Sequence, residues 1–130
     1  MAGFDTNVIV RVLVGDDPTQ TRKAEQAFSE HAATDGVFVS LVVLAEVTWV
    51  LEAAYSWDRA TIHRQVSLLV RTKGVVVEEL ELVQTALDEY IAGKAGLADY
   101  LILGKARTGP GRSLVTFDRK LARTADVTLL

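Results

Sequence analysis

The stretch Gly3-Phe4-Asp5-Thr6-Asn7-Val8-Ile9-Val10 places a carboxylate inside an apolar run close to the start of the chain. Three further acids have similar surroundings: Glu46 within 41–47, Asp99 within 97–103, and Asp118 directly after 113–117. Their apolar neighbours predict that all four carboxylates are buried, and a buried carboxylate without a partner costs several kcal/mol. If the four side chains converge they need a cation between them, so the sequence predicts a metal site.

Length and composition predict one folded domain over residues 1–130. The chain is 49% hydrophobic and 24% charged, which is ordinary for a globular protein with a real core. It has no apolar run near the roughly 18 residues that a membrane span needs, and no pattern typical of a secretory signal. The absence of cysteine excludes disulfides and thiolate ligands. We therefore expect a cytoplasmic protein without a membrane association.

Charge is unevenly distributed, although the net charge is only −3. Residues 78–99 contain six acids and one base, Lys94, whereas residues 100–125 contain six bases and one acid. A basic segment around a carboxylate is typical of an enzyme that acts on a polyanion. Arg112, Arg119 and Lys120 are our candidates for contacting it. The alternative is that Arg119, Lys120 and Arg123 form the solvated face of a short helix.

Strand-like and helical segments alternate along the chain. By propensity alone residues 4–14 form a strand, because they are rich in Val and Ile. We expect further strands at 36–40, 75–78, 113–117 and 127–130. We expect helices at 21–33, 41–55, 59–72, 81–92, 97–108 and 119–124. The expected buried positions are Ile62, Val66, Leu69 and Val70 in one helix, and Leu82, Ala86, Leu87 and Ile91 in another. Such alternation predicts a three-layer α/β fold with a mainly parallel sheet.

That architecture gives each acid a position. In open α/β sheets the functional crevice lies beyond the carboxyl ends of the strands, and Asp5 and Asp118 are expected there. Glu46 lies about two turns into its helix and Asp99 in the first turn of another, each with apolar neighbours three and four residues away. Trp49 is expected in the core.

The ordered set Asp5-Thr6-Asn7, Glu46, Ala98-Asp99-Tyr100 and Thr116-Phe117-Asp118 resembles the PIN-domain nucleases, and among them the VapC-type toxins of prokaryotic toxin–antitoxin pairs. The resemblance covers nearly the whole chain. It implies a single PIN-like three-layer α/β/α domain with a central, mainly parallel sheet of about five strands. It also implies that the first strand ends near Asp5 and that residues 7–13 begin a short helix, against their strand propensity.

The resemblance further implies an endoribonuclease that uses Mg²⁺ or Mn²⁺, and carboxylates are ligands that these cations prefer. Asp5 and Asp99 would be the main ligands, and Glu46 would bind directly or through water. Asp118 would complete a second metal site or orient the attacking water, and the products would carry a 5′-phosphate and a 3′-hydroxyl. Short polar side chains near the acids would hydrogen-bond the carboxylates, or serve only to begin helices: Thr6, Asn7, Ser40 and Thr116.

The partners implied by the resemblance are an RNA substrate, a VapB-type antitoxin and a second copy of the chain in a homodimer. A cluster around residues 49–57, including Trp49 and Trp57, belongs either to an antitoxin surface or to the core. The main alternative function is a catalytically inactive PIN-like module that binds RNA or protein. A phospho-accepting receiver domain is disfavoured, because Asp16-Asp17 lies too far past the first strand and the third strand ends in Glu78.

Overall fold

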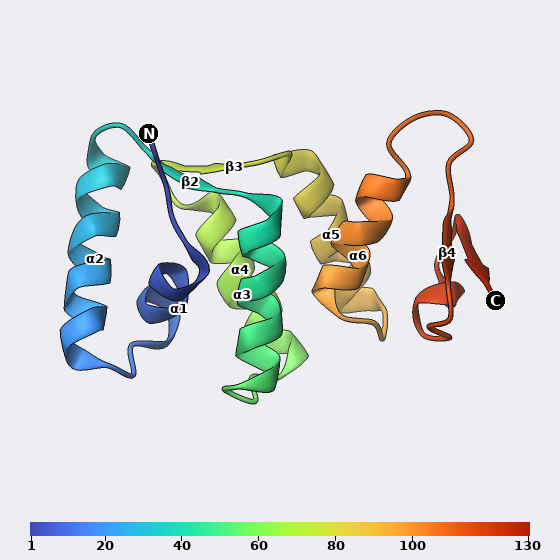
Figure 1. The fold of residues 1–130 in the computed structure, drawn as a ribbon, viewed down its shortest axis with the longest axis horizontal. Coiled ribbons are helices and arrows are strands. Elements are labelled where there is room, and N and C mark those ends of the chain that lie inside the picture. The colour runs from blue at the N-terminus through green and yellow to red at the C-terminus, as the bar shows by residue number, and fades with distance from the viewer. The chain divides into compact units, whose positions relative to one another are not determined.

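The computed structural model describes all of residues 1–130, which form two compact units, Met1–Leu80 and Glu81–Leu130 (Figure 1). The first unit contains, in chain order, β1 (Ala2–Gly3), α1 (Thr6–Val14), α2 (Pro18–Ala33), β2 (Val37–Val39), α3 (Leu41–Ala53), α4 (Arg59–Arg71) and β3 (Val75–Val77). The second contains α5 (Leu80–Ala92), α6 (Leu97–Ala106), β4 (Leu114–Thr116), the short 3-10 helix η1 (Leu121–Arg123) and β5 (Val127–Leu129). The first residue of α5, Leu80, still belongs to the first unit. None of these helices combines the length and the apolar character needed to span a membrane.

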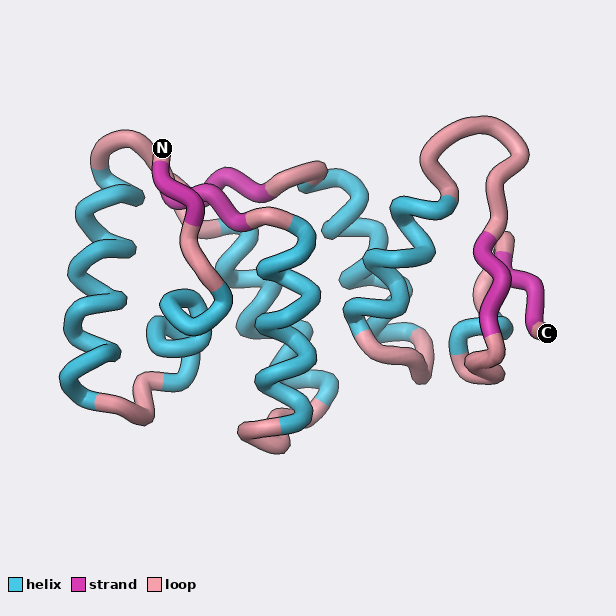
Figure 2. The backbone as a smooth tube through the Cα atoms, in the orientation of Figure 1, coloured by secondary structure: helices cyan, strands magenta, loops and turns pink.

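The first unit is organised around a parallel sheet of three strands in the order β1-β2-β3. Val37 of the central strand pairs with Ala2 of β1 and with Val75 of β3. Figure 2 shows how short all strands are, and none exceeds three residues. Val37 and Val39 are fully buried, as expected for the central strand of a parallel sheet. Helix α1 packs against α2 and α3.

Side-chain caps determine where the helices of the first unit begin. Asp17 Oδ1 accepts a hydrogen bond from the backbone N–H of Gln20 at 3.0 Å and begins α2, while Asp58 Oδ1 accepts from the N–H of Thr61 at 2.8 Å and begins α4. Hydrogen bonds from Thr61 also hold the pKa of Asp58 below its ordinary value. Helix α1 ends at Gly15, whose φ of 71° is left-handed and therefore favours glycine.

The start of α3 is fixed by two side chains that follow neighbouring strands. Ser40 Oγ accepts a hydrogen bond from the N–H of Val43 at 3.2 Å, and Glu78 Oε1 accepts from the N–H of Leu41 at 2.8 Å. Ser40 comes directly after β2 and Glu78 directly after β3. The carboxyl edge of this sheet therefore holds the beginning of α3 in place.

A glycine allows the end of α2 to approach the start of β3. Gly74 has a φ of 89°, and a Cβ atom there would overlap the carbonyl oxygen of Ala32. The carbonyl oxygen of Gly74 also accepts a hydrogen bond from the N–H of Val37 at 2.8 Å. Only a residue without a side chain satisfies both the conformation and the close contact.

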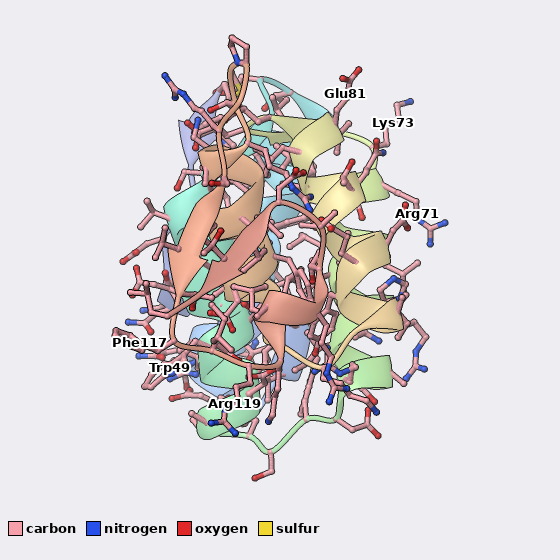
Figure 3. The ribbon with its side chains drawn as sticks, turned by 90° about the vertical axis from the view of Figure 1, so that its right-hand side faces the viewer. Trp49, Arg71, Lys73, Glu81, Phe117 and Arg119 are labelled. Carbon is pink, nitrogen blue, oxygen red and sulfur yellow. The ribbon has the colours of Figure 1, made fainter.

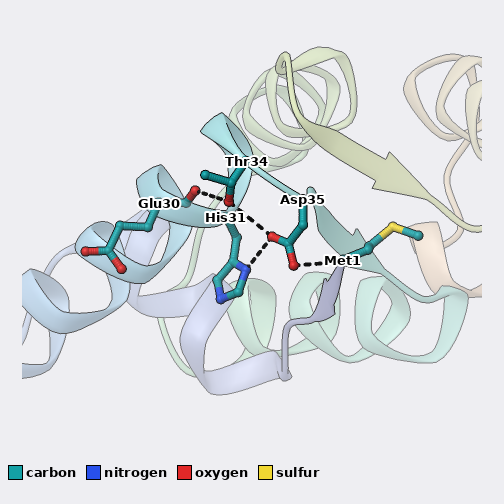
Figure 4. A network of polar contacts seen from close by, with 5 residues as sticks. All are labelled: Met1, Glu30, His31, Thr34 and Asp35. Carbon is teal, nitrogen blue, oxygen red and sulfur yellow. Dashed lines mark hydrogen bonds and ion pairs between the residues drawn. The ribbon is translucent and has the colours of Figure 1, made fainter.

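A polar network ties the first residue to the turn after α2 (Figure 4). The amino group of Met1 donates to Asp35 Oδ2 at 2.8 Å, and His31 Nδ1 lies 2.7 Å from Asp35 Oδ1. Thr34 Oγ1 donates to the carbonyl oxygen of Glu30 at 2.7 Å. Hydrogen bonds from the Met1 amino group, and to a smaller extent from His31, hold the pKa of Asp35 well below its usual range. This arrangement gives His31 a structural partner.

The second unit contains a parallel pair of strands, β4 and β5, in which Leu114 pairs with Val127. Arg107, just after α6, connects three segments of this unit. Its Nη1 lies 3.0 Å from both carboxylate oxygens of Glu89 on α5, and its Nη2 donates to the carbonyl oxygen of Ala125 at 2.7 Å. One guanidinium nitrogen is thus shared between both oxygens of the Glu89 carboxylate, while another binds the backbone at Ala125.

The structure confirms the expected sequence of elements and corrects some details. Residues 6–14 are helical, so the expectation from the resemblance was right and the strand propensity of residues 4–14 was misleading. Five strands are present and all are parallel, but they pair as three in one unit and two in the other. The buried face of α4 is as predicted. On α5, Ala86 and Leu87 are buried as predicted, but Val83 and Tyr90 are buried in place of Leu82 and Ile91.

Candidate active site

The predicted acids are divided equally between the two units, Asp5 and Glu46 in the first and Asp99 and Asp118 in the second. Asp5 stands two residues after β1 and Asp118 two residues after β4, so the expected positions at strand ends are confirmed. Asp99 lies in the first turn of α6 and Glu46 in the second turn of α3.

Three of the four carboxylates accept hydrogen bonds from the backbone at the start of a helix or turn. Asp5 Oδ1 accepts from the N–H of Thr6 at 2.8 Å, and Asp99 Oδ2 accepts from the N–H of Gly96 at 3.0 Å. Asp118 Oδ1 accepts from the N–H groups of Lys120 and Leu121, at 2.8 and 3.3 Å. These bonds position each carboxylate and satisfy N–H groups that a helix start leaves unpaired.

The second oxygen of each of these carboxylates is free of such bonds within its own unit: Asp5 Oδ2, Asp99 Oδ1 and Asp118 Oδ2. The three side chains are thus held by one oxygen and present the other. This division leaves each acid able to serve a further ligand without losing its structural bond.

The expectation that the acids are buried was wrong. Asp5 and Glu46 are exposed, and Asp99 and Asp118 are half-buried. Two of the apolar neighbours of Glu46 on α3 are themselves at the surface, since Val42 is 70% and Trp49 66% exposed. Figure 3 shows the side chain of Trp49 on the outside of its helix, so the prediction that it lies in the core was also wrong. Glu46 makes no hydrogen bond or ion pair within its unit.

The four short polar side chains predicted beside the acids have different environments. Ser40 caps α3, and Thr116 Oγ1 accepts a hydrogen bond from the N–H of Asp118 at 3.0 Å. Asn7 is exposed. Thr6 is 6% exposed, and its Oγ1 is buried without a hydrogen-bond partner. Thr6 therefore retains unused hydrogen-bonding capacity next to Asp5.

The predicted RNA-contacting bases, Arg112, Arg119 and Lys120, are all exposed side chains of the second unit. No ion pair engages them. Arg107 differs from them, because its guanidinium is occupied by Glu89. Part of the basic charge in residues 100–125 is therefore structural and part is available.

Comparison with known proteins places this arrangement in a family. The PIN domain family matches residues 4–127, a stretch that contains all four carboxylates. The chain belongs to this family. It is also 26% identical, over 92% of its length, to a VapC ribonuclease of Aquifex aeolicus (strain VF5), 89% of which the match covers. No solved structure matches the chain.

The donor set of this PIN domain fits a hard divalent cation, although no group of three or more His, Asp or Glu side chains that could hold a metal ion is present. Carboxylate oxygens are the ligands of Mg²⁺ and Mn²⁺, and Mg²⁺ commonly takes only one or two carboxylates and keeps several waters. Asp5 in the first unit, and Asp99 and Asp118 in the second, each keep one carboxylate oxygen of this kind. The residues therefore fit such an ion by chemistry.

The capping role of the acids in the PIN domain was missed by the sequence analysis. The signal was present, since Asp is among the residues most favoured at a helix start. Glu78 was also missed as a cap of α3, because its partner Leu41 lies 37 residues away in the sequence. Contacts of that separation leave no local pattern to detect.

Proposed function

We propose that the chain is a metal-dependent endoribonuclease toxin of a VapBC-type toxin–antitoxin pair. It hydrolyses RNA phosphodiester bonds with Asp5, Glu46, Asp99 and Asp118 around Mg²⁺ or Mn²⁺, within a single PIN domain formed by the whole chain. The observation that carries the proposal is the family match over residues 4–127, which includes all four acids. The likeness to a VapC ribonuclease over 92% of the chain supports the choice of RNA as substrate.

The chain's own residues contribute orientation. Backbone N–H groups fix one oxygen of Asp5, Asp99 and Asp118, so the direction of the other oxygen is set before any ligand binds. Glu46 is unrestrained by such a bond and is free to bind directly or through water. When bound, a divalent ion supplies positive charge to the scissile phosphate and makes a nearby water a stronger nucleophile. Exposed Arg112, Arg119 and Lys120 would bind neighbouring phosphates.

We further propose a VapB-type antitoxin as protein partner, a homodimer as the state of the toxin, and the cytoplasm as its location. Exposed apolar side chains on α3, Val42 and Trp49, support contact with another protein. An inactive module that binds RNA or protein is the alternative. It lacks support because all four acids are present in the matched stretch.

The test is cleavage of total RNA by the purified chain with Mg²⁺ or Mn²⁺, and with EDTA, in wild type, Asp5→Asn and Asp99→Asn. Asn keeps an oxygen that can accept the capping hydrogen bond but removes the charge. We expect loss of cleavage in both variants and retained thermal stability. The controls are Asp17→Asn and Asp58→Asn, which change other aspartates that accept a backbone hydrogen bond at a helix start, outside the proposed site.

Equal cleavage by wild type and the Asp5 and Asp99 variants would contradict the proposed residue roles. Absence of cleavage in wild type, together with no thermal shift on adding Mn²⁺, would favour the inactive module. Loss of activity in the control variants as well would indicate that removing any carboxylate charge at a helix start impairs cleavage. In that case the carboxylates would have no special role.

A further inference from the structure

A cavity of about 350 Å³ in the second unit is lined by three basic side chains. Lys94 comes from the loop after α5, and Lys120 and Arg123 come from the segment around η1. We call this the basic cavity. Its remaining lining includes Glu89, Gly93, Tyr100 and Thr124. Its volume is at the lower end of the range typical for small-ligand sites, so it has room for a nucleotide-sized group.

The charge of the basic cavity is positive. Glu89 is its only acidic lining residue, and both oxygens of that carboxylate are bound by the Arg107 guanidinium at 3.0 Å. All three basic side chains of the lining are exposed, so their charged groups are accessible from solvent. A concave surface with three bases and one neutralised acid attracts an anion.

The walls of the basic cavity are fixed by packing. Tyr100 is 1% exposed, and its hydroxyl accepts a hydrogen bond from the N–H of Ala95 at 3.4 Å. A Cβ atom at Gly93 would overlap the Tyr100 hydroxyl oxygen, so the two residues fit together only because position 93 is glycine. Arg107 connects α5 to the chain at Ala125. One wall of the cavity is therefore formed by a packed side chain that need not be rearranged when a ligand binds, which lowers the cost of binding.

The basic cavity is adjacent in the chain to both carboxylates of its unit. Tyr100 directly follows Asp99, and the backbone N–H of Lys120 donates to Asp118 Oδ1 at 2.8 Å. The cavity is thus built from the same chain segments as two of the four proposed acids. Repeated phosphates are what a single-stranded RNA provides.

We propose that the basic cavity binds a backbone phosphate of the RNA strand, with Lys94, Lys120 and Arg123 as its ligands. The inference rests on the proposed ribonuclease function for the identity of the strand. It adds Lys94 and Arg123 to the residues that bind substrate. It also assigns Lys120 to a defined cavity, with Arg119 outside its lining.

The test measures binding of a fluorescently labelled single-stranded oligoribonucleotide by anisotropy in EDTA, where cleavage is suppressed. The cavity variant is Lys94→Gln/Lys120→Gln/Arg123→Gln. The control is Arg64→Gln/Arg71→Gln/Lys73→Gln, which removes the same charge from exposed positions of the first unit; Figure 3 labels Arg71 and Lys73. We expect the cavity variant to bind roughly tenfold more weakly than the control. The slope of log Kd against log salt should fall by about 0.7 for each phosphate that the variant no longer neutralises.

A charge-preserving variant, Lys94→Arg/Lys120→Arg/Arg123→Lys, should bind nearly as wild type, which separates charge from folding. Equal weakening in the cavity variant and the control would overturn the inference. So would a cavity variant that loses binding of adenosine 5′-monophosphate but keeps its affinity for the strand, since the cavity would then serve a free nucleotide.

Cleavage measured in parallel distinguishes this inference from the proposed function. A wild type that cuts RNA, with a cavity variant that still binds the strand like the control, refutes the cavity alone. A wild type that does not cut RNA, with strand binding lost in the cavity variant, supports the cavity and refutes the nuclease proposal.

Discussion

Replacing Asp5 by Ala and by Asn separates the two roles that the structure and the proposal give to its carboxylate. Oδ1 accepts the hydrogen bond that begins α1, and Oδ2 is the oxygen offered to a cation. Asp5→Ala removes both, and loss of a cap of this kind costs about 1 kcal/mol. For 130 residues the unfolding entropy converts this loss into a fall in Tm of about 4 °C. Asp5→Asn keeps an acceptor at the cap, so its Tm should lie within about 2 °C of wild type.

The assay combines calorimetric Tm values with initial rates of RNA cleavage in Mg²⁺ or Mn²⁺. We expect both Asp5 variants to cut at least roughly 100-fold more slowly, because an electrostatic contribution of this size is typical when one charged partner of a transition state is lost. Asp17→Ala is the matched control, since Asp17 caps α2 in the same unit through a bond of 3.0 Å. It should lower Tm without changing the rate. An Asp5→Asn variant that cuts as fast as wild type, beside an Asp5→Ala variant that only melts earlier, would show that Asp5 is a cap and nothing more.

Three further predictions concern stability. Gly74→Ala should lower the free energy of unfolding by more than about 2 kcal/mol, because it adds a backbone clash to a strained φ. Gly111→Ala, at a φ of 68° with open space around it, should lower it by only about 1 kcal/mol. Urea unfolding of the two variants compares these costs. Arg107→Ala leaves a half-buried carboxylate on α5 unpaired and should cost about 2 kcal/mol in the same assay, so a neutral result would contradict the connecting role of this side chain. Hydrogen bonds from Thr61 lower the pKa of folded Asp58 below its ordinary 3.8. The difference in Tm between wild type and Asp58→Ala should therefore be largest near neutral pH and should shrink as pH falls below 3.8. A difference in Tm that grows on acidification would refute this role of the Asp58 carboxylate.

The secondary structure was predictable from sequence because its signals are local. Asp before Pro18 and Asp58 before a helical pattern are cap signals within four residues, and glycine at 74 marks the end of a segment. The helix after Asp5 is the exception. Its Val and Ile favour a strand, and the helix was expected only from the family resemblance. Here the cap at Asp5 and packing against α2 and α3 outweigh propensity.

The environment of the acids could not be predicted in the same way. Apolar neighbours three and four residues from Glu46 identify a shared face of α3, but they do not say whether that face meets the core or the solvent. Val42 and Trp49 show that it is exposed. The bond from Leu41 to Glu78 and the assembly of the basic cavity depend on contacts between distant segments. Such contacts follow from the tertiary fold alone.

The use of one oxygen for a cap and the other for a ligand has a consequence for local dynamics. The first turn of a helix frays more readily than its interior. When the turn at Thr6 opens, the bond to Asp5 Oδ1 is broken and the carboxylate is free to rotate away from its set direction. A ligand on the other oxygen would oppose that opening. Slower exchange of the Thr6 amide hydrogen would then report that the site is occupied, through a change confined to the first turn of α1.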